Sequence, residues 1–199
     1  MKIRIKANRL AITFLFMLFP VIASAEETSQ ISYADTAWIM VSSALVMLML
    51  PGLALFYGGM VRRKNVLSTL MHSFIPLGVI TVQWVLFGYS LAFGNDIGHF
   101  VGDLSKVLFM GIDFKTLSGT IPEYLFSMFQ LMFAIITAAL ISGGMAERVD
   151  FKAYIIFIFI WSTVVYDPIC HWVWGGGWLG DMGALDFAGG TVVHIASGT

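Results

Sequence analysis

The chain has 199 residues, of which 58% are hydrophobic and only 12% are charged, and its mean hydropathy is +0.86. A soluble domain has about 25% charged residues, so this composition excludes an ordinary soluble protein and indicates one that folds in a lipid bilayer. The net charge of -1, without a long basic segment, argues against a nucleic-acid partner because phosphate binding needs clustered Lys and Arg.

The first 25 residues are typical of a secretory signal peptide. Four basic side chains precede an apolar run over residues 10–22, which is followed by the small residues Ala23, Ser24 and Ala25. We therefore expect cleavage after Ala25. An uncleaved first membrane helix is the alternative, but Pro20 and the short apolar run disfavour it.

Four apolar segments follow, each long enough to cross a hydrocarbon core of about 30 Å at about 1.5 Å per residue. They cover residues 38–61, 66–93, 124–146 and 153–173. Residues 94–122 are rich in Gly and carry Asp and Lys side chains, so we expect an extramembrane loop there, with short surface helices at most. The third and fourth segments are joined by a tight charged turn.

The last apolar segment, residues 186–199, is too short to cross the membrane. As a helix, its 14 residues would measure about 21 Å. A chain end there would leave carbonyl groups and a carboxylate in hydrocarbon, which is costly. The sequence therefore suggests a partial reading frame that stops inside a helix.

The distribution of basic residues predicts the orientation. The turns after the first and third spans hold three and two Lys or Arg residues, whereas the loop over residues 94–122 holds two and the last loop none. The positive-inside rule then places the two short turns in the cytoplasm and the mature N-terminus outside, as expected for a multi-pass protein of a bacterial inner membrane.

Asp186 lies where the last helix is expected to begin. As an N-cap, its carboxylate could accept the backbone N–H of Gly189 and favour the positive end of the helix. This capping role is the preferred interpretation from the residues alone. A direct role in binding remains the alternative.

His194 lies on a face of small residues in this last segment. The face comprises Gly190, His194, Ser197 and Gly198, spaced as one side of a helix. Small residues let another backbone approach closely, so the imidazole is expected to face the helix bundle. A histidine inside a membrane suggests a functional site, although a structural hydrogen bond to a neighbouring helix is equally compatible with its position.

Two groups of aromatic residues recur on the third and fourth spans. Phe126, Phe129 and Phe133 form one stripe on the third span, and Trp172, Trp174 and Trp178 cluster at the outer end of the fourth. Packing is the simpler explanation for the stripe, and an interfacial aromatic belt for the Trp cluster. The alternative role of the Trp cluster is to present π-faces to a small cation, each worth about 0.5–2 kcal/mol.

Several motifs resemble those of ammonium transporters of the Amt/Mep/Rh family, in the order in which that family has them. They are Ala54–Gly59, Arg62–Asn65, Gly143–Arg148, His171–Gly177 and Gly183–His194. The last is highly specific to the family, whereas each glycine pair alone is a weak signal. The motifs extend over nearly all of the mature chain.

The resemblance implies an all-α polytopic membrane protein, with residues 26–199 forming a partial ammonium transporter domain. This domain would be the first of two inverted five-helix repeats, truncated within its fifth helix, in a protein that forms homotrimers at full length. By position, Trp174, Phe133 and Asp186 resemble the ammonium-recognition site, Phe129 and Phe133 the pore gate, and His194 the first of two pore histidines. The implied substrates are ammonium and ammonia, without a cofactor or enzymatic activity.

Two other functions are compatible with some of these residues. An intramembrane metalloenzyme could use ligands from the set Asp167, Cys170, His171, Asp186 and His194, but the sequence has no HExxH or paired-histidine spacing. An ammonium sensor would use the same pore site to signal to a partner. Because half of the pore wall would be missing, we also expect the 199-residue chain to be inactive on its own.

Overall fold

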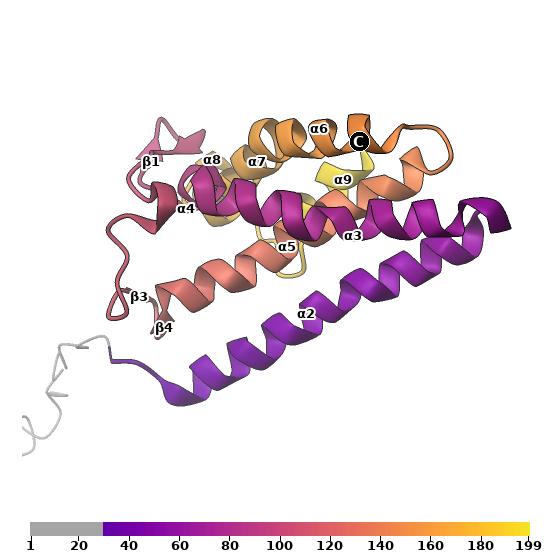
Figure 1. Ribbon diagram of the computed structural model, residues 1–199. Coiled ribbons are helices and arrows are strands. Elements are labelled where there is room, and N and C mark those ends of the chain that lie inside the picture. Colours follow the sequence, from indigo (N-terminus) through magenta and orange to yellow (C-terminus); the bar gives the residue numbers. More distant parts are fainter. Residues whose placement is uncertain (1–29) are drawn as a thin grey trace, which may run out of the picture. The chain divides into compact units, whose positions relative to one another are not determined.

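Four helices of this chain are long and apolar enough to cross a membrane. They span Tyr33–Met60, Arg63–Phe93, Glu123–Met145 and Phe151–Asp181 in a computed structural model that describes residues 30–199 (Figure 1). These helices correspond to the four predicted spans, and the all-α polytopic fold is confirmed. The expected signal peptide, residues 1–25, lies outside the described residues.

The membrane helices are interrupted and joined by shorter elements. In chain order the elements are α2 (Tyr33–Met60), η1 (Arg63–Asn65), α3 (Val66–Gln83), η2 (Trp84–Gly88), α4 (Tyr89–Phe93), β1 (Asp96–Ile97), β2 (Val101–Gly102), η3 (Val107–Phe109), β3 (Leu117–Ser118), β4 (Ile121–Pro122), α5 (Glu123–Met145), α6 (Phe151–Trp161), η4 (Ser162–Tyr166), α7 (Asp167–Trp174), α8 (Trp178–Asp181), η5 (Gly190–Ile195) and α9 (Ala196–Gly198). The first span begins at Tyr33, five residues before the predicted start at residue 38. The Ser32 hydroxyl accepts the backbone N–H of Asp35 at 3.2 Å and so caps the additional turn.

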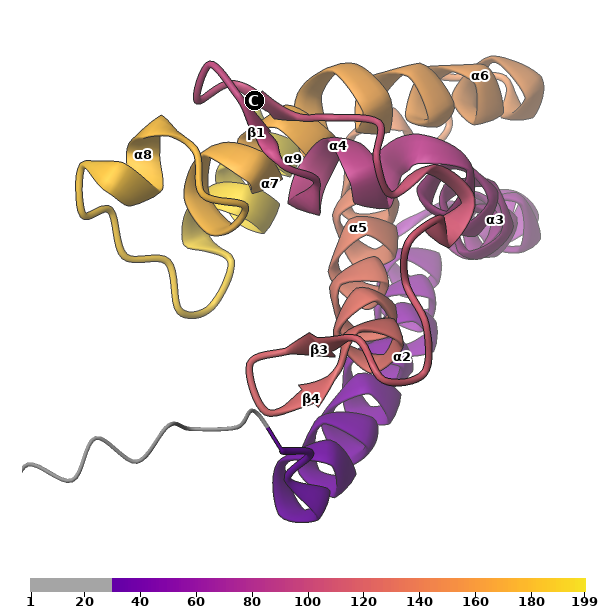
Figure 2. The same cartoon turned by 90° about the vertical axis from the view of Figure 1, so that its left-hand side faces the viewer.

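α5 is the central helix of residues 31–199. It packs against both α2 and α3, while α3 also packs against α6 (Figures 1 and 2). Of its most apolar stretch, 56% is buried, against 17% for α2. The small side chains Ala134, Ala138 and Ala139 are almost completely buried and allow the neighbouring helices to approach closely.

Wide helical turns interrupt the second and fourth spans at η2 and η4. Polar side chains bond between helices beside these turns. Gln83 donates to Asp167 at 2.6 Å, and the indole N–H of Trp84 donates to the Ser127 hydroxyl at 3.1 Å. All four side chains are buried, where an unpaired polar group would be costly, so these bonds fix how α3 faces its neighbours.

Residues 94–122 form a loop at one end of the helices, as predicted, with two short antiparallel hairpins, β1–β2 and β3–β4. The loop is attached to α7 through His171, whose buried ring contacts the Ala92 carbonyl at 3.0 Å and the Asp96 carboxylate at 2.9 Å. The hydrogen bond from His171 is the main reason that the pKa of Asp96 lies below its usual value.

Glu123 anchors the same loop at the start of α5. Its carboxylate accepts hydrogen bonds from the Lys106 ammonium at 2.6 Å and the Tyr89 hydroxyl at 2.8 Å. The residue is only 5% exposed. Charge-assisted bonds at such a buried position are stronger than those of a surface ion pair.

We predict that Glu123→Ala lowers the free energy of unfolding by about 3 kcal/mol, because Lys106 and Tyr89 both lose their acceptor in a buried setting. Thermal unfolding of the detergent-solubilised protein would measure this loss. Lys115→Ala, at an exposed position of the same loop, serves as the control and should change little. Equal effects of the two substitutions would contradict the anchoring role.

Candidate functional site

A hollow of about 520 Å³ lies between α5, the end of α7 and the segment before η5. Its walls combine aromatic rings with a few polar groups. The lining residues are Phe126, Phe129, Gln130, Phe133, Val173, Trp174, Asp186, Phe187, Ala188 and Gly189. The hollow thus brings together Phe129, Phe133, Trp174 and Asp186, which the sequence analysis selected from segments far apart in the chain.

We call this first hollow the outer hollow. Its aromatic side chains contact one another edge to face. The Phe129 and Phe133 ring centroids are 5.0 Å apart at 85°, and those of Phe133 and Trp174 are 6.0 Å apart at 68°. Phe126 also lines the hollow, while its ring packs against Phe93 at 5.1 Å. Edge-to-face packing restrains these rings and leaves other ring surfaces available for a cation.

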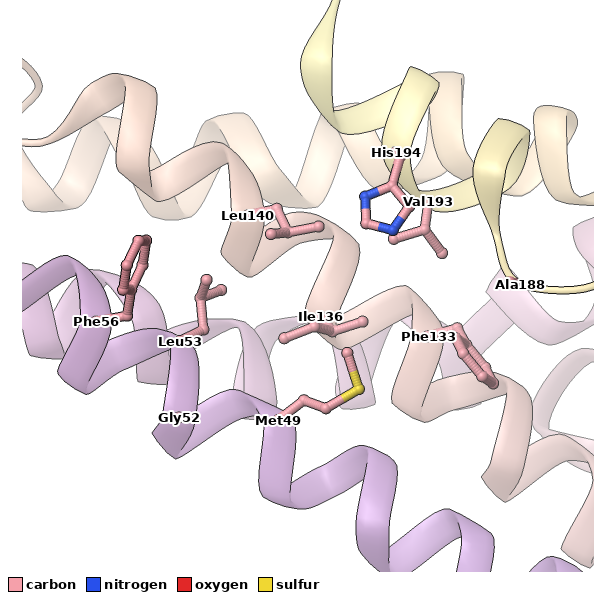
Figure 3. Close-up of a pocket in the computed structure, with 10 residues that line it drawn as sticks. All are labelled: Met49, Gly52, Leu53, Phe56, Phe133, Ile136, Leu140, Ala188, Val193 and His194. Carbon is pink, nitrogen blue, oxygen red and sulfur yellow. The ribbon is translucent and has the colours of Figure 1, made fainter.

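A second hollow, of about 350 Å³, shares Phe133 and Ala188 with the first and is called the inner hollow. Figure 3 shows the His194 ring projecting from the last segment toward Ile136 and Leu140 of α5, with side chains of α2 beyond them. Apart from His194, its lining is apolar, comprising Met49, Gly52, Leu53, Phe56, Phe133, Ile136, Leu140, Ala188 and Val193. Within the described residues, no hydrogen bond forms to the imidazole of His194, so its nitrogen atoms are available to a small molecule.

The predicted small-residue face of the last segment is divided between two hollows. His194 lines the inner hollow, whereas Ser197 and Gly198 line a different one beside Trp161. The prediction assumed a regular helix, but residues 190–195 form a wide turn, η5. An extra residue in a turn rotates the following side chains by about 100°, because a regular helix has 3.6 residues per turn.

Asp186 holds the start of the last helical segment. Its carboxylate accepts the backbone N–H groups of Gly190 at 2.7 Å, Thr191 at 2.8 Å and Val192 at 3.0 Å. The predicted cap on the Gly189 N–H is thus extended along the chain to three further amides, because the helix begins at Gly190 and not at Asp186. Asp186 itself is partly exposed.

The backbone of Asp186 also positions Trp174. The Trp174 indole N–H donates to the Asp186 carbonyl at 2.9 Å, which connects the end of α7 to the last segment. Gly189 makes the intervening turn possible, because its φ of 75° is left-handed and a Cβ there would lie 2.7 Å from Val193 Cγ2. The short segment that begins at Asp186 therefore holds both Trp174 and the start of the helical segment that carries His194.

The other two tryptophans of the predicted cluster lie outside both hollows. Trp172 and Trp178 pack together at 5.8 Å, and the Trp172 indole N–H donates to the Phe100 carbonyl at 2.7 Å. They hold the loop over residues 94–122 against α7 and α8. Periodicity could not separate them from Trp174 because their partners come from distant loops.

The residues considered as metal ligands are engaged separately. Asp167 bonds Gln83, His171 bonds Ala92 and Asp96, and Asp186 bonds backbone amides. Across residues 30–199, no cluster of three or more His, Cys, Asp or Glu side chains could hold a metal ion.

Gln130 is a lining residue that the sequence analysis did not select. It lies four residues after Phe126 and three before Phe133, so it shares their face of α5. That spacing was the signal in the sequence that could have identified Gln130 as a lining residue. A single polar residue within an aromatic stripe has no periodicity of its own.

Comparisons with known proteins agree with this arrangement. Residues 37–199 match the model of the Ammonium Transporter Family. The chain is 55% identical over 168 residues to an ammonium transporter of Bacillus subtilis and 48% identical over 167 residues to the ammonium transporter Amt1 of Archaeoglobus fulgidus. These alignments cover 82% and 84% of this chain but 41% of each relative, so the chain spans about two fifths of their length.

Solved structures give the same result. The G343C mutant of Candida albicans Mep2 superposes with a TM-score of 0.78 at 40% identity, covering 87% of this chain and 39% of that one. A sensor Amt protein superposes with a TM-score of 0.73 at 28% identity, covering 80% of this chain and 40% of that one. The chain therefore belongs to the ammonium transporter family and corresponds to its N-terminal half.

Proposed function

We propose that the described residues form the outer recognition chamber and part of the pore wall of an ammonium channel. The observation that supports this proposal is the pair of hollows that share Phe133, one containing Trp174 and the other His194. We infer that Phe129 and Phe133 form one side of a gate between them. The more distant likeness of the sensor Amt protein, at 28% identity, makes transport the better-supported function.

Recognition in the outer hollow would use aromatic faces and polar groups together. Moving an ammonium ion from water into hydrocarbon is costly, so a cation needs compensating contacts before it enters. The faces of Trp174, Phe129 and Phe133 each supply about 0.5–2 kcal/mol of cation–π attraction. In this proposal Asp186 acts indirectly, because its carboxylate is bound to backbone amides and its carbonyl holds Trp174.

Past Phe133 the surroundings favour the neutral molecule. The inner hollow offers apolar side chains and one imidazole, so a charged ammonium would lose its solvation there, whereas ammonia loses little. Deprotonation at the boundary follows from this difference. A neutral His194 ring presents one donor and one acceptor, which allows it to bond ammonia or relay a proton without adding a fixed charge.

We further infer a multi-pass protein of a bacterial inner membrane with its mature N-terminus outside. The basic turns at residues 62–64 and 147–152 lie together, because the Arg62 N–H and the Asn65 amide both donate to Glu147. The hairpins lie at the opposite end of the helices (Figure 1). This charge distribution supports a cytoplasmic location for the two turns.

We also propose a homotrimer for the full-length protein, from the family resemblance.

His194→Ala should reduce methylammonium uptake or change its selectivity more than it changes folding. The complete open reading frame that encodes this chain would be expressed in cells without their own ammonium transporters. We expect uptake by the wild type and a loss of about tenfold in the variant, equivalent to about 1.4 kcal/mol. His99→Ala, in the loop over residues 94–122 and away from both hollows, is the matched control and should retain uptake. Equal losses of assembled protein and of uptake in His194→Ala would instead indicate a structural histidine.

Asp186→Ala should disrupt the start of η5 and release Trp174. Loss of the carboxylate that accepts three amides is expected to lower the free energy of unfolding by about 1–2 kcal/mol and to reduce uptake. Asp186→Asn retains one acceptor oxygen and should have an intermediate effect on both. Thermal unfolding and uptake would be measured on the same preparations. Normal stability together with lost uptake would instead favour a direct role in binding.

The 199-residue chain expressed alone should not conduct. Phe187 remains 91% exposed next to the recognition residues, so the wall of the outer hollow is incomplete there. Charged groups and water would have free access to such an incomplete wall, so selection between ammonium and ammonia would be lost. Methylammonium uptake by cells that produce only these 199 residues, at the level given by the complete reading frame, would contradict this inference.

A further inference from the structure

Gln130 is a buried amide without a hydrogen-bonding partner. It lies on α5 and is 9% exposed, and its Oε1 atom is both inaccessible and unbonded. Its Nε2 atom forms no hydrogen bond within residues 30–199 either. Nearly all buried polar side chains in folded proteins are bonded, so an amide of this kind requires an explanation.

The surroundings of Gln130 connect it to the outer hollow. It lines that hollow together with Phe133 and Trp174. Because neither end of the amide is bonded, the group can turn by 180° about its terminal torsion without losing a hydrogen bond. The oxygen can therefore face the hollow whenever a donor enters it.

Packing alone does not account for a glutamine here. A leucine or methionine of similar size would fill the space without leaving buried polar atoms unbonded, and such replacements are often neutral or stabilising. The amide therefore lowers the stability of the empty chamber. A ligand with an N–H donor would restore its missing hydrogen bond.

We propose that Gln130 is a specificity-determining residue of the outer hollow, and that its amide oxygen accepts a hydrogen bond from an ammonium or alkylammonium ion. This inference rests on the proposed function. The aromatic rings attract positive charge of any kind, whereas the amide oxygen favours a cation that carries N–H donors.

The same arrangement disfavours potassium. A potassium ion must replace its hydration shell with several oxygen atoms, as the carbonyl rings of potassium channels do. A single amide oxygen beside Phe133 and Trp174 cannot provide such a shell. One directed bond together with aromatic faces is better matched to a small ion with four N–H groups.

Gln130→Leu and Gln130→Met test the inference in the complete reading frame. For both variants we expect thermal stability equal to or above that of the wild type. We also expect the half-saturation concentration for methylammonium uptake to rise about tenfold, which corresponds to about 1.4 kcal/mol, while the maximal rate stays within about twofold. Inhibition of uptake by potassium should become relatively stronger. Met128→Leu, on the exposed face of the same helix, is the matched control and should change none of these quantities.

The possible failures are distinct. If the wild type takes up methylammonium but both Gln130 variants retain its half-saturation concentration, this inference is wrong and the proposed function stands. Lower thermal stability in both variants would also overturn it, because the amide would then have a structural partner. Absence of uptake by the wild type would overturn the proposed function and this inference with it.

Discussion

A helix that begins inside a membrane protein has N–H groups without partners, and in this chain Asp186 provides acceptors for three of them. The same residue holds the Trp174 indole through its carbonyl oxygen. Both walls of the site therefore depend on one short segment that links α7 to η5. If this segment moved, the aromatic wall of the outer hollow and the imidazole of the inner one would move with it.

Phe133 divides two environments along α5. The outer hollow contains the carboxyl group of Asp186, the amide of Gln130 and the indole of Trp174, whereas the inner one contains only apolar side chains and His194. The free energy of a charged molecule therefore rises steeply from the outer hollow to the inner one, while that of a neutral molecule changes little. The proposed change of protonation state at Phe133 rests on this difference between the two linings.

The spans and the aromatic stripe could be predicted because they depend on composition and periodicity, whereas Trp174, Asp186 and His194 were selected as site residues through the family resemblance. Phe126, Phe129 and Phe133 share one face of a regular helix, and α5 is regular over its whole length. The last segment could not be predicted in the same way, because Gly189 adopts a left-handed conformation and η5 contains a wide turn. Neither feature has a periodic signature. The Asp186 cap therefore reaches further along the chain than predicted, and the predicted small-residue face was wrong.

The different positions of regular and irregular elements have a physical basis. Residues that must keep fixed separations, such as Phe129, Gln130 and Phe133, lie on the most buried helix, where close packing limits their movement. Trp174 and His194, which line the two hollows from other segments, come from interrupted helices whose ends are set by specific hydrogen bonds. A regular helix alone would leave His194 facing in the same direction as Ser197. The wide turn separates them, and it gives the imidazole to the inner hollow at the cost of an irregular backbone that Asp186 must then satisfy.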